Sequence, residues 1–351
     1  MKKSMRTLLT VMLGSFMIFL LPVAAGESSS PPEKTLTLSL IGDCTIGEQE
    51  EYRGYGYSFT GRMKKLGMEY PFSNVIDLFM ADDITLANCE GVFTKRKQHE
   101  DKRTNLRATP EWAQVFSLGG VDVVNISNNH TYDYFPRGRV DTKEALKAVD
   151  VGFFGDGDLW VAQVKGIMIG MTGYTYPHRE DISRQIKDIK ALREMGCDLV
   201  IVSMHWGKEL NPDPTGEQLK LGPALIDAGA DIVYGHGPHV LQPIQLYKGK
   251  PIFYSLANFV FGADPNPRDS DTAVISLTYD LSGEEAVPAR LEAIPMRMHK
   301  NKDYRPYAYT KEADRIRVWD KLVFPEKASV SSGLPTGFAQ AGVAVLFPRF
   351  E

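Results

Sequence analysis

The segment Asp231-Ile-Val-Tyr-Gly-His236-Gly-Pro-His239-Val-Leu-Gln242 decides the architecture that the sequence predicts. Its first four residues form a short apolar run typical of a buried strand, which stops at a glycine and is followed by two histidines in a tight turn. Pro238 fixes the backbone between the histidines. Imidazoles displayed at the end of a strand can bind a metal ion or carry a proton. The segment therefore predicts a buried strand with a functional turn at its carboxyl end.

Four other apolar runs end in the same way, each with a side chain that can bind a metal. They are residues 37–41 before Asp43, residues 84–87 before Asn88 and Glu90, residues 121–126 before Asn128, Asn129 and His130, and residues 199–204 before His205. In α/β folds, functional residues commonly collect just past the carboxyl ends of buried strands. Five such endings are hard to obtain by chance, so the sequence predicts that they converge on one divalent-metal site. Mixed oxygen and nitrogen donors favour Mn, Fe or Zn over Ca.

Each ending alone also has an ordinary structural explanation. Asp43 could close a turn, Asn88 could begin one, and a lone histidine after a strand is commonly a satisfied structural residue. Two features favour function. Asn88 and Glu90 lie two residues apart, so they project to the same side of extended backbone, and His130 follows a buried strand, where it can hold a transferable proton. Two further residues are candidates for contacts around the site: Glu209, which follows His205, and Asn258, which follows an apolar run at residues 252–256.

Hydrophobic periodicity indicates an α/β domain. A continuous apolar run at residues 199–204 is typical of a parallel strand buried on both faces. Residues 161–164 and 167–172, separated by a Lys-Gly turn, predict an antiparallel hairpin, so the sheet is expected to be mixed. Amphipathic spacing predicts helices at residues 181–195 and 215–229.

No repeat or linker divides residues 35–297, which are expected to form one domain. Residues 298–351 are expected to be a C-terminal extension that packs on this domain and contains a helix at residues 312–322. Two polar segments, residues 50–65 and 94–107, are expected to be loops without regular structure.

The N-terminus has the residue order of an export signal. Three basic residues precede an apolar run at residues 8–23, which small residues follow. Residues 1–25 are therefore predicted to be a cleaved signal peptide or an uncleaved membrane anchor, because the apolar run is borderline in length for spanning a bilayer. Residues 26–34 would form a short linker. The protein is expected to be exported and to act outside the cell, in the periplasm or anchored at the cell surface.

Charge and cysteine content narrow the function further. The net charge of -4, without a basic cluster interleaved with aromatic residues, argues against a nucleic-acid partner. The three cysteines, Cys44, Cys89 and Cys197, do not make a disulfide framework. For Cys44 and Cys89 the favoured interpretation is that of small buried residues beside the site, with a disulfide or metal ligation as the alternatives.

Six motifs, taken in order, resemble the bacterial capsule-synthesis (CapA) family, which is associated with poly-γ-glutamate capsule. They are Gly42-Asp43, Asn88-x-Glu90, Ser127-Asn-Asn-His130, His205-Trp-Gly-x-Glu209, Gly235-His-x-Pro-His239 and Asn258-Phe-Val-Phe-Gly262. The resemblance extends from about Leu36 to Gly262. This family in turn is similar to the calcineurin-like metallophosphoesterases. The resemblance therefore implies a four-layer α/β/β/α sandwich with two mixed sheets and metal ions between strand ends.

The resemblance also implies a role for each residue. The first metal would be bound by Asp43 and His239, and Glu90 would bridge the two metals. The second metal would be bound by Asn129, His205 and His236. His130 would be the proton donor or would stabilise the transition state. Asn88, Asn128, Glu209 and Asn258 would lie around them. Two departures from the phosphoesterase pattern leave open whether the site holds one ion or two. Thr45 stands where that pattern has a histidine, and two residues instead of one separate His236 from His239.

Three functions remain open at this point. The first is a metal-dependent hydrolase that acts on a phosphoester or an anionic polymer. The second is a catalytically weak cell-surface factor that binds or exports an anionic polymer, with membrane capsule-synthesis proteins as partners. The third is a structural fold whose polar strand ends satisfy one another, which the cost of burying polar groups without an ion disfavours.

Overall fold

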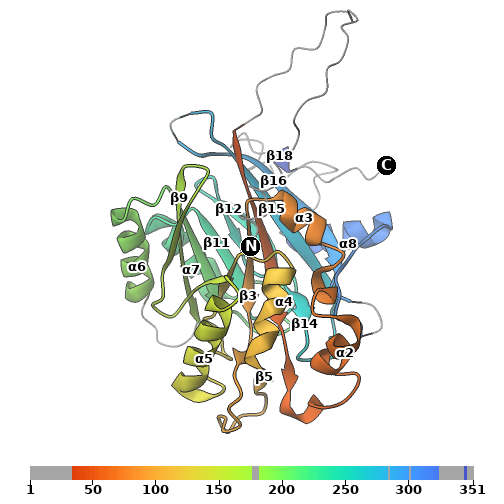
Figure 1. Ribbon diagram of the computed structural model, residues 1–351. Helices are drawn as coiled ribbons and strands as arrows, with labels where there is room; N and C mark the ends of the chain where they lie inside the picture. Colours follow the sequence, from red (N-terminus) through yellow and green to blue (C-terminus); the bar gives the residue numbers. More distant parts are fainter. Residues whose placement is uncertain (1–33, 176–181, 284, 300–301, 324–343, 346–351) are drawn as a thin grey trace, which may run out of the picture.

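Figure 1 shows a computed structural model of the protein, which describes residues 34–175, 182–283, 285–299, 302–323 and 344–345. The predicted export segment and nearly all of the predicted linker lie outside the described residues, as does most of the tail after residue 323. Within the described part of the chain, no helix combines the length and the apolar character that a bilayer span requires.

The larger sheet has nine strands in the described residues, in the order β17-β16-β15-β1-β3-β6-β7, with β14 beside β1 and β18 beside β16. The strands are β1 (Thr35–Thr45), β3 (Ile84–Cys89), β6 (Val123–Asn125), β7 (Gly152–Phe154), β14 (Asn258–Phe261), β15 (Asp271–Asp280), β16 (Val287–Arg297), β17 (Tyr307–Ala308) and β18 (Ala344–Val345). Strands β14, β1, β3, β6 and β7 are parallel, and β15, β16 and β17 add an antiparallel half.

The second sheet has six strands in the described residues, in the order β12-β13-β11-β10-β9-β8. Its strands are β8 (Trp160–Val164), β9 (Ile167–Thr175), β10 (Leu199–His205), β11 (Ile232–His236), β12 (Ile244–Tyr247) and β13 (Lys250–Phe253). The four inner strands are parallel, and each edge strand is antiparallel to its neighbour. A small third sheet joins β2 (Glu48–Gln49), β5 (Leu106–Ala108) and β4 (Val92–Phe93).

Helices cover the outer faces of the two large sheets (Figure 1). The helices are α2 (Phe59–Leu66), α3 (Ile76–Ala81), α4 (Gln114–Leu118), α5 (Phe135–Lys147), α6 (Ser183–Glu194), α7 (Gly216–Asp227) and α8 (Glu312–Leu322), with short 3-10 turns at Glu50–Tyr52, Tyr70–Phe72 and Pro110–Ala113. Helix α8 is the exception, because its apolar residues pack into the core between the sheets. Helices α2 to α5 pack on the larger sheet, and α6 and α7 pack on the smaller one. The predicted α/β/β/α sandwich with two mixed sheets is confirmed.

The alternation of side chains along the strands builds the layers. In β10, Leu199 and Ile201 enter the core between the sheets, whereas Val200 and Val202 enter the core under α6 and α7. Successive residues of a strand point to opposite faces, so a strand buried on both faces needs an unbroken apolar run. This is the physical reason for the run at residues 199–204.

Several expected elements are confirmed, one expected loop is wrong, and a second is a loop that ends in a strand. The hairpin of β8 and β9 is antiparallel as expected, and α6, α7 and α8 lie where periodicity places them. Residues 50–65 instead contain a 3-10 turn and most of α2, because Ser58 caps the helix and Phe59 and Met63 are buried. The end of the segment 94–107 is strand β5, in which Leu106 is buried.

Asp271 ties the C-terminal helix to the larger sheet. Its buried carboxylate accepts hydrogen bonds from Arg317 (2.9 Å) and Lys321 (2.7 Å) of α8 and from Tyr309 (2.6 Å). Burial alone would raise the pKa of Asp271, but these hydrogen bonds outweigh burial and hold that pKa well below its usual range. Val318 completes the contact by packing into the core between the sheets.

We expect Asp271→Asn to lower the free energy of unfolding by about 2 kcal/mol at neutral pH, because hydrogen bonds to charged groups are lost. The folded-state pKa lies below the unfolded one, so ionised Asp271 stabilises the fold above about pH 4, and this contribution is lost as the pH falls through the folded-state pKa. Urea unfolding of both proteins should show a difference that shrinks on acidification. Asp320→Asn, exposed on the same helix, is the matched control and should unfold like the wild type.

Candidate metal centre

A row of polar side chains crosses the larger sheet where its parallel strands end. Asp43 of β1 lies in register with Asn258 of β14 on one side and with Asn88 of β3 on the other, and Asn125 of β6 lies beside Asn88. All four side chains are buried. Register shifts in β1 on both sides of Asp43 mark a local irregularity that re-aims the strand at this point.

The smaller sheet brings histidines to the same place. His205 and His236 are register partners at the ends of β10 and β11, and both are buried. His239 lies in the turn after β11 with a φ of 59°, a left-handed backbone that non-glycine residues seldom adopt. Such strain at a ligand-bearing turn is a recurrent feature of functional sites.

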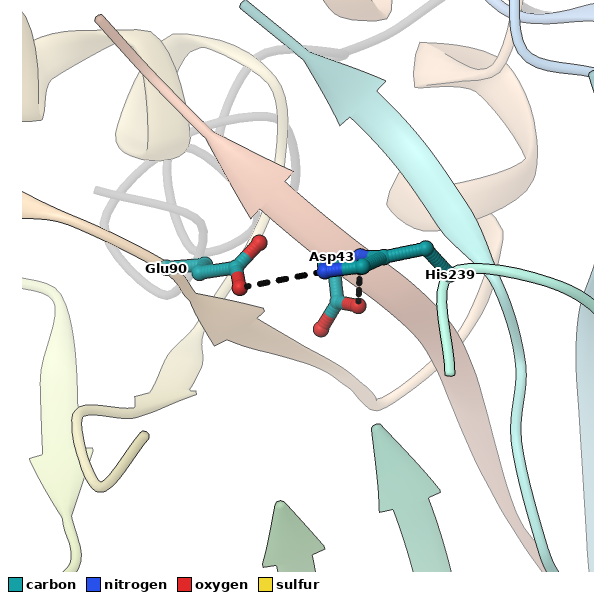
Figure 2. A group of neighbouring side chains, drawn as sticks. All are labelled: Asp43, Glu90 and His239. Atoms are coloured by element: carbon teal, nitrogen blue, oxygen red, sulfur yellow. Dashed lines mark ion pairs between the residues drawn. The ribbon is translucent and has the colours of Figure 1, made fainter. Parts of the chain in front are cut away.

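The two sheets meet at Asp43. The Nδ1 atom of His236 lies 3.2 Å from Oδ1 of Asp43, and Nδ1 of His239 lies 3.2 Å from Oδ2. Nε2 of His239 lies 3.7 Å from Oε1 of Glu90, which completes the group drawn in Figure 2. Ligand atoms of Asp43, Glu90 and His239 all lie within 4.8 Å of one another, as a shared metal ion requires.

Several atoms that could bind a metal, in this group and in the two neighbouring histidines, are buried without the hydrogen bonds that buried polar atoms normally make. Within the described residues, Oδ2 of Asp43, Oε1 of Glu90, Nδ1 of His205 and both ring nitrogens of His236 have no hydrogen-bond partner. An unpaired buried polar atom costs free energy, so five at one point require a compensating group. Carboxylate oxygens and imidazole nitrogens are ligands for a borderline divalent cation, so the residues present fit a metal ion.

The electrostatics of the group agree with this interpretation. Burial lowers the pKa of His205 to about 3, so its imidazole is neutral and offers a lone pair at neutral pH. Burial alone would raise the pKa of Asp43, but His236 and His239 outweigh it and hold that pKa well below its usual range. The carboxylate of Asp43 is therefore charged and central to the cluster.

Glu90 and His239 influence each other. Burial raises the pKa of Glu90 to about 7. Burial alone would lower the pKa of His239, but the carboxylates of Glu90 and Asp43 outweigh it and raise the pKa to about 10. A positive charge is therefore stabilised between these two carboxylates, which is the place that a divalent cation would take.

Amide side chains hold the ligands in position. Asn88 donates to Oδ1 of Asp43 (2.7 Å) and accepts from Asn125 (3.0 Å) and Asn128 (3.3 Å). Asn258 pairs with Nδ1 of His239 at 2.8 Å. These contacts fix the orientation of one carboxylate and one imidazole, the role that outer partners play around metal ligands. The sequence analysis did not identify Asn125 as a site residue because it lies inside an apolar run. Its position near the end of a strand was the only available indication.

His130 lies beside this network with one ring nitrogen already engaged. Its Nδ1 pairs with Oδ2 of the buried Asp133 at 2.8 Å, and its main-chain N–H donates to Oδ1 of Asn128. Asp133 also forms an ion pair with Lys102 and accepts from the N–H of Leu106 (2.6 Å). This arrangement leaves Nε2 as the nitrogen able to exchange a proton with a ligand. Sequence reasoning missed Asp133, and its spacing of three from His130 was the available signal.

Comparison with known proteins identifies the family. Residues 37–263 match the sequence profile of the family described as "Bacterial capsule synthesis protein PGA_cap". The chain belongs to this family. The matched span begins in β1 and ends just past β14, so it contains every residue of the metal centre and excludes helix α8. The family resemblance expected from the six motifs is confirmed.

Three curated relatives have informative descriptions. The chain is 29% identical to "Capsule biosynthesis protein CapA" of Bacillus anthracis, over 82% of this chain and 75% of that protein. It is 30% identical to "PGA biosynthesis protein CapA" of Bacillus subtilis (strain 168), over 79% and 76%. It is 26% identical to a "Probable polyglutamine synthesis accessory protein" of Mycobacterium tuberculosis, over 51% and 56%.

In this member of the family, most of the predicted site residues come together. The structure gathers Asp43, Glu90, His205, His236 and His239, with Asn88, Asn128, Asn258 and His130 next to them. Asn129 and Glu209 are exposed, and no contact of the described residues joins their side chains to the group. The buried neighbour Asn128, and not Asn129, contacts Asn88. A ligand role for Asn129 stays a prediction.

Thr45 and two cysteines lie next to the residues of the metal centre. Thr45, which stands where the phosphoesterase pattern has a histidine, donates to Oε2 of Glu90 at 3.3 Å. Cys44 and Cys89 are register partners in β1 and β3, and both are buried free thiols, as is Cys197. The favoured interpretation of the cysteines is therefore confirmed.

Proposed function

We propose that this chain is an exported capsule-biosynthesis protein with a divalent-metal hydrolase site that acts on an anionic polymer or a phosphoester. The observation that carries the proposal is the set of five buried ligand atoms at the meeting point of the two sheets that have no hydrogen-bond partner in the described residues. Membership of the capsule-synthesis family supplies the biological setting. Membrane proteins of capsule synthesis are the proposed partners.

The metal would be Mn, Fe or Zn, held as one ion or two by Asp43, Glu90, His205, His236 and His239. A cation at this point supplies Lewis-acid chemistry, which activates water and polarises the oxygen of the scissile group. The protein supplies orientation. Asn88 and Asn258 hold Asp43 and His239, and the low dielectric of the buried strand ends strengthens the charges that act on the substrate.

His130 would donate a proton to the leaving group. Its Nδ1 is held by Asp133, which orients the ring and stabilises the imidazolium. Asp133 is in turn neutralised by Lys102, so the buried carboxylate carries no unbalanced charge. The proton would leave from Nε2, and the ring would recover a proton from the water that attacks.

The test is metal analysis and a substrate screen. Protein lacking the first 25 residues is purified, and its Mn, Fe and Zn content is measured by mass spectrometry. We expect about one or two bound ions and hydrolysis of model phosphodiesters or γ-glutamyl peptides. A protein that stays empty when offered each metal, or that hydrolyses neither substrate class when loaded, would overturn the hydrolase proposal.

One observation favours a second function, that of a catalytically weak surface factor that binds or exports the polymer. Thr45 occupies the place of a histidine ligand and hydrogen-bonds Glu90, which leaves fewer donors for a second ion. A deletion strain separates the two functions. Capsule rescued by the His130→Ala/His236→Ala variant would favour the binding factor, and capsule rescued only by the wild type would favour the hydrolase.

A further inference from the structure

A cavity of about 590 Å³ lies next to the metal centre, between the ends of β6 and β9 and the start of α6. Asn128 lines it and also contacts Asn88, the partner of Asp43. Thr175 also lines the cavity and is the register partner of His205. A ligand held in this cavity would therefore reach the metal centre over the side chain of Asn128.

The amino end of α6 forms one wall of the cavity. Ser183, Arg184 and Gln185 make up the first turn of this twelve-residue helix and all line the cavity. Ile182 stands at the N-cap position, and within the described residues it makes no side-chain capping hydrogen bond. The first N–H groups of a helix carry partial positive charge and lack partners inside the helix. This wall therefore attracts negative charge.

Arg184 adds a full positive charge that a ligand can use. Its side chain is 56% exposed and forms an ion pair with Asp156 at 3.3 Å. Asp156 also accepts a hydrogen bond from the hydroxyl of Tyr132, so it does not depend on Arg184. An exposed ion pair at this distance contributes little, and the guanidinium can turn to a ligand carboxylate with two parallel hydrogen bonds.

Gln185 provides the independent observation that a ligand is missing. Its side chain lines the cavity and is 6% exposed, yet its Oε1 atom has no hydrogen-bond partner in the described residues. A buried amide oxygen without a donor is costly. Because this oxygen can only accept, its partner must bring an N–H or O–H group, and the N–H of an amide linkage is one such donor. The carboxylate that Arg184 would bind cannot be that partner.

Arg184 and Gln185 are adjacent and would therefore bind two different groups of one ligand. We propose that the cavity is a binding subsite for an acidic residue in amide linkage, with the carboxylate at Arg184 and the amino end of α6, and the amide N–H at Oε1 of Gln185. The hydroxyl groups of Ser127 and Thr175, which lie 3.2 Å apart, would contact the rest of the unit. The inference deepens the proposed function and rests on it for the polymer that is bound.

Calorimetric binding tests the proposal with a γ-linked hexamer of glutamate as the probe. The same hexamer with amidated side chains removes the charge, and free glutamate separates a polymer from a single amino acid. We expect Arg184→Met to weaken binding of the acidic hexamer about tenfold and to leave the amidated hexamer unchanged. Gln185→Met, of similar volume, should weaken both hexamers by about fivefold to tenfold.

Lys190→Met is the matched control, since Lys190 is exposed on the same helix and does not line the cavity; it should bind like the wild type. Equal binding of the acidic and amidated hexamers by the wild type, no binding of the acidic hexamer, or wild-type affinity in both cavity variants would overturn the subsite. Tighter binding of free glutamate than of the hexamer would also overturn it.

The binding experiment tests the subsite independently of the proposed hydrolase activity. If the wild type holds no metal and hydrolyses nothing, but both cavity variants weaken binding of the hexamer, the subsite stands and the hydrolase fails. If hydrolysis is found and both cavity variants bind like the wild type, the hydrolase stands and the subsite fails.

Discussion

Asp43→Asn is expected to lower the affinity for the divalent metal and the rate of hydrolysis by at least about 100-fold, since loss of an outer partner alone costs about 10-fold to 100-fold. Asp43 is the point where the two sheets meet, and it contacts both His236 and His239. Asparagine keeps the shape of the side chain and removes its charge. The metal would lose its central anionic ligand while the surrounding packing stays the same.

The same substitution should also lower the free energy of unfolding of the metal-free protein. The folded-state pKa of Asp43 lies below its usual range, so the ionised carboxylate stabilises the fold through His236 and His239. The amide keeps only a hydrogen bond with Asn88. Mass spectrometry of bound metal, hydrolysis assays and urea unfolding measure the three quantities. Asp82→Asn is the matched control. Asp82 is also buried but lies at the opposite end of β3, where it accepts from Thr85. Full metal content in Asp43→Asn would remove Asp43 from the site.

Gly42→Ala is expected to lower the free energy of unfolding by about 3 kcal/mol or more, because the clash is with backbone that cannot move aside. A Cβ atom at Gly42 would lie 2.0 Å from the carbonyl oxygen of Ala257 and 2.7 Å from that of Leu256. The next residue, Asp43, donates its N–H to the same Ala257 oxygen at 2.8 Å. The close approach of these segments is therefore what places Asp43.

Metal content should fall together with stability, since a shifted β1 moves Asp43 away from the histidines. Urea unfolding and metal analysis of the same preparation measure both effects. Gly216→Ala is the matched control, because a Cβ atom at Gly216 would meet open space at the start of α7. We expect that control to match the wild type or to gain a few tenths of a kcal/mol from better helix propensity. Wild-type stability of Gly42→Ala would contradict the close-approach explanation.

The proposals that the protein is exported and that it has membrane partners do not rest on the geometry of the metal centre. The apolar N-terminal run lies outside the described residues, and the names of the relatives describe capsule and PGA biosynthesis in those proteins. The cleavage of residues 1–25 is open to direct measurement, by sequencing the N-terminus of protein isolated from the cell surface.

The sequence by itself determined the strands and the residues at their ends. A strand buried on both faces needs an unbroken apolar run, and such a run ends abruptly where the chain turns, so Asp43, Glu90, His205 and His236 could be found from local pattern. The helices with clear apolar spacing were found for the same reason, since that spacing is local, whereas α2 in a polar segment was missed. The order of the six motifs along the chain was sufficient to identify the family.

The tertiary structure alone decided which of these residues meet. Register between strands aligned Asn125 with Asn88 and Asn88 with Asp43, and register depends on packing between distant segments. Asn128 is buried and the next residue, Asn129, is exposed. The sequence cannot distinguish these two adjacent asparagines. The pairing of His130 with Asp133 and the unpaired oxygen of Gln185 are likewise contacts through space. The local sequence pattern predicts which residues lie near a strand end. Only the packing of the two sheets determines which of their atoms lie within bonding distance.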